Sequence, residues 1–176
     1  MSFAKRPAVF FDRDGVLNVD KGYINHKEDF QWIPGAPKAI KKLNDFGYLV
    51  FVITNQSGIA RGYYPEESVI KLHEYMNEEL SMINARIDAF YYCPHHTEGK
   101  IKEYTIECNC RKPLPGMILQ AFEEWEPRID KEKSFAVGDK ERDLEAATAA
   151  GISSYLFEGG NLNTFVNDIF KKTNSN

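Results

Sequence analysis

The sequence predicts an α/β protein, a single Rossmann-like three-layer domain built on a parallel sheet. Three observations support this fold class. Short apolar runs alternate with segments of helical apolar spacing along most of the chain, and such alternation is typical of parallel strands with helices on both faces. The 176 residues suit one domain with a substantial core. No repeat or linker divides them, so we expect residues 1–176 to form one domain.

Five short runs predict strands, and five segments with apolar residues on one face predict helices. The strands are expected at Ala8–Phe11, Tyr48–Ile53, Ala89–Cys93, Ser134–Val137 and Ser153–Phe157. The helices are expected at Gly35–Phe46, from Pro65 onward, at Gly116–Trp125, Asp143–Ala150 and Leu162–Phe170. In the second helix the buried face is expected to carry Val69, Leu72, Met76, Leu80 and Ile83. The polar tail Lys171–Asn176 is expected to fray.

Composition and charge exclude several classes of protein. The chain is 43% hydrophobic and 27% charged with a net charge of −4, which argues against a nucleic-acid partner because no global basic field exists. No apolar run approaches the roughly 20 residues that span a bilayer, so no membrane partner is expected. Without a signal-peptide core or an even cysteine count, we expect a cytoplasmic protein without a disulfide framework. Nothing demands more than a monomer.

Asp12 and Asp14 directly follow the first predicted strand. The carboxyl end of a strand in an open α/β sheet is where active sites lie. One aspartate there can act as a nucleophile while the other transfers a proton, and both offer the hard oxygen ligands that Mg²⁺ prefers. Taken alone, however, Asp-Arg-Asp-Gly is also compatible with an ordinary turn.

Polar residues follow other predicted strands in the same way. Thr54-Asn55-Gln56-Ser57-Gly58 comes after the second strand, and Gly138-Asp139-Lys140 with Asp143 comes after the fourth. Arg111-Lys112 precedes the third helix, and such cations can neutralise or grip a phosphoryl group. Each segment alone fits a helix cap, a turn or a solvated cation pair. Together they favour one phosphate-handling site, because parallel strands bring their carboxyl ends to the same edge.

The long connection after the third strand contains a second candidate metal site. Cys93 and His95, like Cys108 and Cys110, are spaced by two, so in extended backbone each pair points the same way. Together the two pairs offer three thiolates and one imidazole, and four such ligands suit tetrahedral Zn²⁺. His96 is the alternative ligand, and three incidental cysteines are the alternative interpretation. A structural zinc in residues 93–110 would hold the loop that ends at Arg111 and Lys112.

This ordered set of motifs resembles the haloacid dehalogenase-type phosphatases over roughly residues 8–151. The resemblance implies that Asp12 attacks phosphorus to form an aspartyl-phosphate, and that Asp14 protonates the leaving oxygen and then activates water. It implies that Thr54 and Lys112 stabilise the phosphoryl group, and that Asp143 orients Lys112 or a metal-bound water. The implied Mg²⁺ ligands are the Asp12 carboxylate, the Asp14 main-chain oxygen and Asp139.

The zinc loop narrows the resemblance to the small histidinol-phosphatase and heptose-bisphosphate phosphatase group. DRDGVLNVDKGYI, TNQSGIARG, YYCPHH, CNCRKPLPGM and VGDKERD are similar to the heptose branch. This implies a small phosphorylated sugar as substrate, with hydrolysis of the C7 phosphate of a heptose 1,7-bisphosphate during nucleotide-activated heptose biosynthesis. The implied substrate-binding residues are Asp20, Lys21, Gly22, Tyr23, Asn55, Gln56, Ser57, Arg111 and Lys140.

Some features depart from the family or leave the function open. The family usually carries a large cap domain, for which this chain has no room, so we expect only a short flap between Val16 and Trp32. Val16 stands where many relatives have Thr, and Arg61 has no assigned role. A histidinol-phosphate phosphatase is the main alternative. An inactive zinc-stabilised binding module is the second alternative, disfavoured by the complete set of catalytic residues. The preferred sugar anomer stays open.

Overall fold

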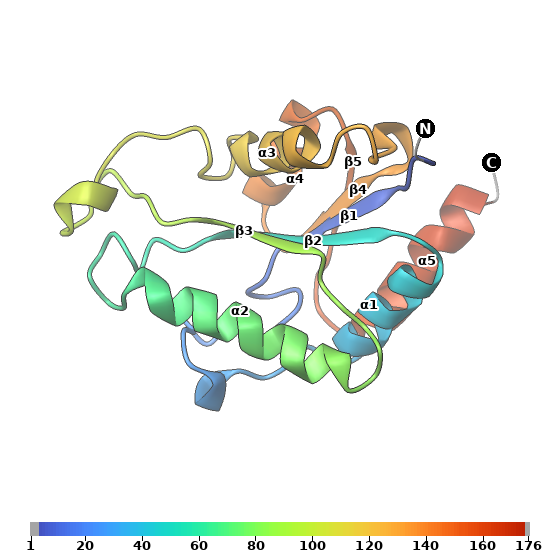
Figure 1. Ribbon diagram of the computed structural model, residues 1–176, viewed down its shortest axis with the longest axis horizontal. Helices are drawn as coiled ribbons and strands as arrows, with labels where there is room; N and C mark the ends of the chain where they lie inside the picture. The colour runs from blue at the N-terminus through green and yellow to red at the C-terminus, as the bar shows by residue number, and fades with distance from the viewer. Residues whose placement is uncertain (1–3, 175–176) are drawn as a thin grey trace.

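Five parallel strands form one sheet in the computed structural model, which describes residues 4–174 (Figure 1). The strand order is β3-β2-β1-β4-β5. The strands are β1 (Ala8–Phe11), β2 (Leu49–Asn55), β3 (Ala89–Cys93), β4 (Phe135–Gly138) and β5 (Ser153–Leu156). The helices are α1 (Ala36–Asp45), α2 (Glu66–Ser81), α3 (Gly116–Trp125), α4 (Glu141–Ala149) and α5 (Leu162–Asn174). Single-turn 3₁₀ helices lie at η1 (Lys27–Asp29), η2 (Lys102–Tyr104) and η3 (Lys131–Lys133).

Both faces of the sheet are covered, which confirms the three-layer prediction. Helices α1, α2 and α5 pack on one face, and α3 and α4 pack on the other (Figure 1). Successive residues of β1 alternate between these layers: Val9 and Phe11 join the first core, whereas Ala8 and Phe10 join the second. A strand buried on both faces must be apolar at every position, which explains the uninterrupted run at residues 8–11.

Several predicted boundaries differ from the structure. Strand β2 extends to Asn55 because Thr54 and Asn55 pair with Tyr92 and Cys93 of β3. Helix α4 begins at Glu141, before the predicted start. Ile83 lies beyond the end of α2 and is 42% exposed, so its placement on the buried helix face was wrong.

The described part of the polar tail is helical. Helix α5 continues through Lys171 and Lys172 to Asn174, and its last turn gains from basic side chains near a helix C-terminus. Residues 175–176 lie outside the described part of the chain.

The strand order places a topological switch point between β1 and β4. The chain proceeds from β1 through β2 to β3 on one side, and then returns to add β4 and β5 on the other. Connections leave the carboxyl ends of β1 and β4 in opposite directions, which opens the crevice where α/β proteins bind ligands. Asp12 lies at this crevice, and its backbone N–H donates a hydrogen bond to the carbonyl of Val137 of β4 over 3.0 Å.

Residues 4–174 contain no cap domain, and a short connection between β1 and α1 stands in its place. It folds back on itself through an antiparallel bridge between Asn18 and Trp32 and contains η1. This agrees with the short flap expected between Val16 and Trp32. Among the helices of the described chain, none is both long and apolar enough to span a membrane.

Candidate active site

Asp12 is the first residue after β1, and its carboxylate lies at the centre of the site. The residue is 7% exposed. Its Oδ1 accepts hydrogen bonds from the ammonium group of Lys112 and from the backbone N–H of Arg13, both over 2.9 Å. Burial raises the pKa of Asp12 to about 8, although the charge of Lys112 opposes this. Both of these hydrogen bonds use Oδ1 rather than Oδ2.

Lys112 provides a fixed positive charge beside Asp12. Its Nζ contacts Asp12 Oδ1 at 2.9 Å, Asp143 Oδ1 at 2.7 Å and the carbonyl of Ile53 at 2.9 Å. Burial lowers the pKa of Lys112, but the two carboxylates raise it by more, so it lies above the usual value. The ammonium group therefore stays charged, because the two carboxylates more than compensate for the water that it loses on burial.

Asn55 holds the backbone of Lys112 in position. Its side-chain oxygen accepts from the Lys112 N–H over 3.0 Å, and its amide nitrogen donates to the Lys112 carbonyl over 3.2 Å. The last residue of β2 thereby anchors a segment that lies 57 residues further along the chain. In this structure Asn55 is thus committed to Lys112, and its predicted contact with substrate stays a prediction.

Asp139 and Asp143 complete a cluster of three acids with Asp12. Oxygen atoms from the three carboxylates lie within 4.8 Å of one another. Asp143 Oδ2 accepts from the backbone N–H groups of Asp139 and Lys140, over 3.1 and 3.0 Å. The Oδ1 atom of Asp139 is buried without a hydrogen-bond partner.

This cluster fits a small divalent cation. An unpartnered carboxylate oxygen near a second carboxylate is the donor set that Mg²⁺ takes in proteins. Gly15, with φ +87°, leaves room for Asp139, because a Cβ there would lie 2.2 Å from Asp139 Oδ2. Asp12 and Asp139 are the side chains that would hold the ion, because Asp143 already forms an ion pair with Lys112.

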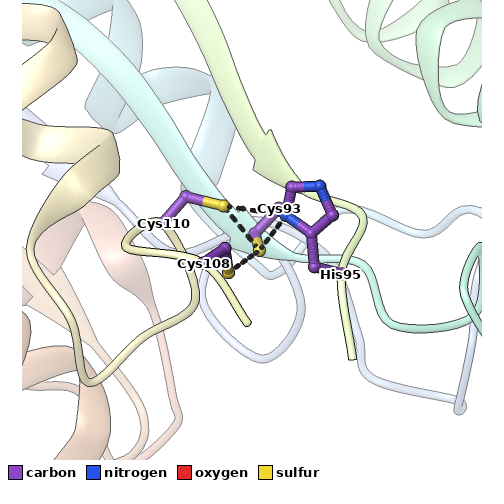
Figure 2. Close-up of side chains that lie close together, drawn as sticks. All are labelled: Cys93, His95, Cys108 and Cys110. Atoms are coloured by element: carbon purple, nitrogen blue, oxygen red, sulfur yellow. Dashed lines mark hydrogen bonds between the residues drawn. The ribbon is translucent and has the colours of Figure 1, made fainter. Parts of the chain in front are cut away.

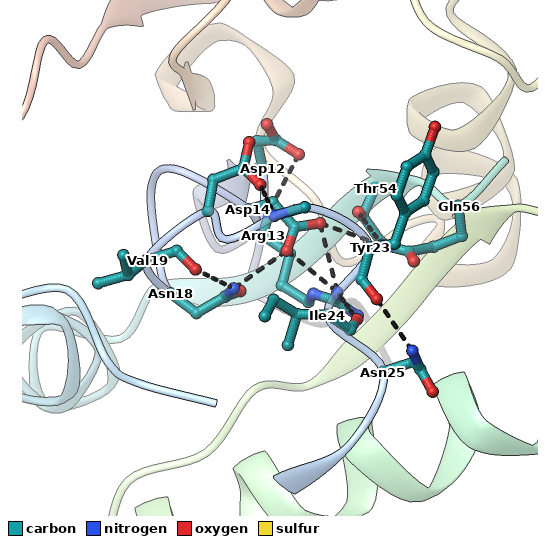
Figure 3. A network of polar contacts seen from close by, with 12 residues as sticks. Asp12, Arg13, Asp14, Asn18, Val19, Tyr23, Ile24, Asn25, Thr54 and Gln56 are labelled. Carbon is teal, nitrogen blue, oxygen red and sulfur yellow. Dashed lines mark hydrogen bonds and ion pairs between the residues drawn. The ribbon is translucent and has the colours of Figure 1, made fainter. Parts of the chain in front are cut away.

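The side chain of Asp14 points away from this cluster into a network of donors (Figure 3). Asn18 Nδ2 donates to Oδ1 over 3.0 Å, and Gln56 Nε2 donates to Oδ2 over 3.2 Å. The guanidinium of Arg13 lies 3.1 and 3.3 Å from the two oxygens. The same Gln56 amide donates to Thr54 Oγ1 over 2.8 Å, which links Asp14 to the end of β2.

The sequence did not predict roles for Arg13 and Asn18, which contact Asp14, or for His73, which contacts Arg13. Arg13 and Asn18 lie inside the acidic motif itself, between and just after the two aspartates. His73 occupies the buried face of α2, where it is 4% exposed among Val69, Leu72 and Met76. A polar side chain on an apolar helical stripe was the available signal, because such a residue must find a partner in the interior.

Four side chains from the long connection and the end of β3 meet in a second cluster (Figure 2). Cys93, His95, Cys108 and Cys110 each bring a ligand atom within 4.8 Å of the others. The Cys93 sulfur lies 3.6 Å from that of Cys108, and His95 Nδ1 lies 3.7 Å from Cys93 Sγ and 3.3 Å from Cys110 Sγ. Ligands of a tetrahedral ion with bonds of about 2.3 Å are separated by roughly 3.7 Å, so this set could hold zinc.

The protonation of the thiols agrees with a metal-binding role. Cys93 and Cys110 lie 2.8 Å apart, and this contact lowers the pKa of Cys110 to about 5 and raises that of Cys93. Metal ligation requires thiolates, so binding of a metal would release the protons that these thiols carry. His96 lies outside the cluster and contacts Arg61 instead, with Nη2 3.2 Å from Nε2.

Most of the remaining predicted substrate-binding residues are exposed. Asp20, Lys21, Gly22 and Tyr23 form an exposed turn of the flap, in which the Gly22 N–H donates to Asp20 Oδ1 over 3.0 Å. Lys140 is exposed, with its Nζ 3.9 Å from Asp139 Oδ2. Ser57 Oγ accepts from Arg61 over 3.4 Å.

Arg111 and Lys112 line a cavity of about 450 Å³ within the long connection, together with His96 and Pro113. The Arg111 Nη1 is buried and has no hydrogen-bond partner. Burial lowers the pKa of Arg111, and the charges of Arg142 and Arg61 lower it further. A half-buried guanidinium with an unpartnered donor beside other cations can bind an anion.

Comparison with known proteins identifies the family. The model of the polynucleotide kinase 3 phosphatase family matches residues 7–154. A D-glycero-beta-D-manno-heptose-1,7-bisphosphate 7-phosphatase from Rhodopseudomonas palustris is 47% identical over 168 residues, which cover 96% of this chain and 92% of the relative. The chain belongs to this family of haloacid dehalogenase-type phosphatases.

Solved structures of similar phosphatases share the fold. A putative HAD-like phosphatase from Mesorhizobium loti superimposes with a TM-score of 0.81 at 34% identity, over 89% of this chain and 75% of that one. A D,D-heptose 1,7-bisphosphate phosphatase from B. bronchiseptica, solved with magnesium and phosphate, gives 0.81 at 29% identity, over 94% and 99%. As a member of the family, the chain is a phosphoric monoester hydrolase.

Proposed function

We propose that this phosphatase removes the C7 phosphate of D-glycero-β-D-manno-heptose 1,7-bisphosphate, in the biosynthesis of nucleotide-activated heptose. The observation that carries the chemistry is the buried Asp12–Lys112–Asp143 cluster at the switch point of the sheet. The sugar and its β anomer are supported by the relatives, which carry this substrate in their names at 43–48% identity.

The first chemical step is transfer of the phosphoryl group to Asp12. Oδ2 attacks phosphorus, a new oxygen–phosphorus bond forms, and the bond from phosphorus to the C7 oxygen breaks. Asp14, entering the step protonated, donates its proton to the departing C7 oxygen. Lys112 neutralises charge on the transferring group and the Thr54 hydroxyl donates a hydrogen bond to it, since positioning and charge stabilisation are the principal requirements of phosphoryl transfer.

The second step releases phosphate. Asp14, now a carboxylate, takes a proton from water as the water oxygen attacks phosphorus. The bond between phosphorus and the Asp12 oxygen breaks, which restores the Asp12 carboxylate, and the proton taken from water leaves Asp14 ready for the next cycle. Asp143 supports both steps as a positioning residue, because its ion pair with Lys112 and its two backbone bonds hold the ammonium group in place.

Mg²⁺ and Zn²⁺ are the metals that we propose for the two clusters. Mg²⁺, held by Asp12, Asp139 and the main-chain oxygen of Asp14, would neutralise phosphate charge. Zn²⁺, held by Cys93, His95, Cys108 and Cys110, would fix the loop before Arg111. With that loop fixed, the Arg111 guanidinium and the exposed Lys140 are available to contact the far phosphate, while the flap residues from Asp20 to Tyr23 contact the sugar.

Phosphate release from three substrates with Mg²⁺ tests the proposed specificity. We expect the highest kcat/KM for the β anomer of the heptose bisphosphate, less for the α anomer and least for histidinol phosphate. A higher kcat/KM for histidinol phosphate would overturn the heptose assignment in favour of the alternative activity. Absence of release from all three would support the non-catalytic binding module.

Asp12→Asn tests the aspartyl-phosphate mechanism. The variant is nearly isosteric, but its amide is a poor nucleophile, so kcat should fall by a factor of about 10⁴ or more, since the covalent route is lost. Asp45→Asn, an exposed residue that pairs with Lys41 at the end of α1, is the matched control. Full activity of Asp12→Asn would rule out Asp12 as the nucleophile.

We also propose a monomeric, cytoplasmic enzyme of one domain. The continuous sheet and its two covering layers support a single domain. Sedimentation equilibrium measures the oligomeric state, and cell fractionation measures the location. A dimer mass, or recovery with the membrane fraction, would contradict these two assignments.

A further inference from the structure

A fully buried arginine lies next to the catalytic aspartates. Arg13 is 0% exposed, and within residues 4–174 the one carboxylate that it contacts is that of Asp14. Its Nε is buried without a hydrogen-bond partner. Burying a guanidinium is costly unless its donors are satisfied. The remaining contacts of Arg13 therefore indicate what this residue contributes.

The two terminal nitrogens of Arg13 have different partners. Nη2 donates to Asp14 and also to the carbonyl of Ile24, over 2.7 Å. Ile24 belongs to the flap and follows Tyr23 directly, so one nitrogen links the flap to Asp14 (Figure 3). Nη1 lies 3.2 Å from Nε2 of His73. A guanidinium has donors only, so Nε2 is the acceptor of this bond.

His73 is itself held firmly. Its ring stacks on Phe90 of β3 at a centroid distance of 4.3 Å and an angle of 14°. Burial, together with the charge of Arg13, lowers the pKa of His73 well below its usual value. The ring is therefore neutral and keeps an unprotonated nitrogen facing Arg13. Helix α2 supplies His73 and strand β3 supplies Phe90, and together they fix the orientation of the guanidinium.

We propose that Arg13 and His73 are positioning residues for Asp14, with His73 fixing the guanidinium that joins Asp14 to the flap. This inference rests on the proposed role of Asp14 as general acid and base. Asn18 and Gln56 already donate to Asp14, so Arg13 is not needed merely to satisfy that carboxylate. Its distinct contribution is the connection between Asp14, the flap and the interior.

Dependence on the leaving group separates this role from a merely structural one. An alkyl oxygen needs a proton from Asp14 to depart, whereas p-nitrophenolate departs without one. The parameter kcat/KM includes only the steps up to departure of the first product, so it reports on this proton transfer. Comparing kcat/KM for the heptose bisphosphate with kcat/KM for p-nitrophenyl phosphate therefore reports on the placement of Asp14 together with the flap that Arg13 joins to it.

The test uses His73→Phe, which keeps an aromatic ring on Phe90 but removes the acceptor, and Arg13→Lys, which cannot hold both Asp14 and His73. Each should lower kcat/KM for the sugar phosphate by about 10-fold or more, a part of the usual contribution of general acid catalysis. Each should lower kcat/KM for p-nitrophenyl phosphate by less than about 3-fold, because no proton is needed there. His73→Gln, whose side-chain oxygen can accept from Arg13, should recover most of the loss.

Met76→Leu is the matched control, because Met76 lies one turn further along the buried face of α2 and contributes only packing. It should leave both substrates unaffected. Equal losses on both substrates, or no loss on either, would overturn the inference. If His73→Phe does not fold, the pair Arg13→Lys and His73→Gln decides it by the same ratio.

Asp14→Asn distinguishes failure of the inference from failure of the proposed function. Selective loss on the sugar phosphate in Asp14→Asn, without it in the His73 and Arg13 variants, would contradict the inference alone. Absence of selective loss in Asp14→Asn would contradict the general-acid role and the inference together.

Discussion

At the scale of single residues, close approach decides what the active site can contain. Gly15 has a left-handed backbone conformation and lies against Asp139. A Cβ at this position would overlap the Asp139 carboxylate. Gly138 is similar, since a Cβ there would lie 2.1 Å from that of Asp143. These two glycines let the acids approach the backbone and one another.

Gly15→Ala should therefore lose both stability and activity. The positive φ of +87° costs an alanine about 1–2 kcal/mol in unfolding free energy. Displacing Asp139 should lower kcat by about 100-fold, the effect of a misplacement near 1 Å. Gly47→Ala, at φ +84° with open space around its Cβ, should lose the stability but keep the activity. Denaturant melts and Mg²⁺-dependent kinetics measure both, and equal activity in the two variants would contradict the argument.

His73 should make stability depend on pH. Burial and the charge of Arg13 lower the pKa of His73 in the folded protein, whereas the unfolded chain takes up this proton below about pH 6.5. The unfolded state then binds more protons, so the unfolding free energy falls as pH drops below that value, by up to about 1.4 kcal/mol per pH unit.

His73→Gln should remove this contribution. Urea melts from pH 7.5 to 5 should show a shallower fall in unfolding free energy for His73→Gln than for the wild type. His26→Gln, at an exposed position of the flap, is the matched control and should follow the wild type. Parallel curves for the wild type and His73→Gln would show that the neutral buried ring contributes no pH dependence.

At the scale of elements, the connection between β3 and α3 is the part that most needs external support. It spans residues 94–115, and its only regular structure is the single turn η2. Tyr104 donates to Glu66 of α2 over 2.8 Å, and Ile101 N–H donates to Ala60 over 2.9 Å. Because the loop has little core, ordering it costs conformational entropy that the Cys/His cluster can offset.

Cys108→Ser should uncouple this loop from the site. Without the full ligand set, bound zinc should be lost, and kcat/KM should fall by at least about 10-fold, because Lys112 follows the loop and misplacement is costly. Zinc content, kinetics and limited proteolysis at the exposed Lys102 measure these effects. His96→Ala, outside the cluster, should retain zinc. A zinc-free protein with unchanged kcat/KM would contradict the positioning role.

At the scale of the whole molecule, the sheet separates two cores. Trp32 packs against the core on the α1 and α5 face, and Trp125 packs against the core on the α3 face, where its ring lies 5.2 Å from that of Phe51. Both cores share the same strands, so neither layer can lose its packing without exposing the other side of the sheet. Unfolding should therefore be cooperative.

Single-tryptophan variants test this cooperativity. Trp32→Phe leaves Trp125 as the reporter for one face, and Trp125→Phe leaves Trp32 for the other. In zinc-replete buffer, the fluorescence transition of each variant should coincide with its own transition by circular dichroism, as two-state unfolding requires. Separated transitions within one variant would indicate that the two layers unfold independently.

The sequence by itself determined the elements and the acidic motif. Apolar periodicity predicted all five strands and five helices, because burial on two faces or on one stripe is a local property. It also predicted that Asp12 and Asp14 follow a buried strand. The family resemblance, rather than spacing, assigned Lys112 to them.

Only the tertiary structure decided which contacts the side chains of that site make. Lys112 meets Asp12 across 100 residues of sequence, and His73 meets Arg13 across 60. Periodicity could place His73 on a buried face but could not name its partner. The physical reason is that a buried charge or donor is satisfied by whatever the packed chain brings within about 3 Å, and that depends on the crossing of elements rather than on local sequence.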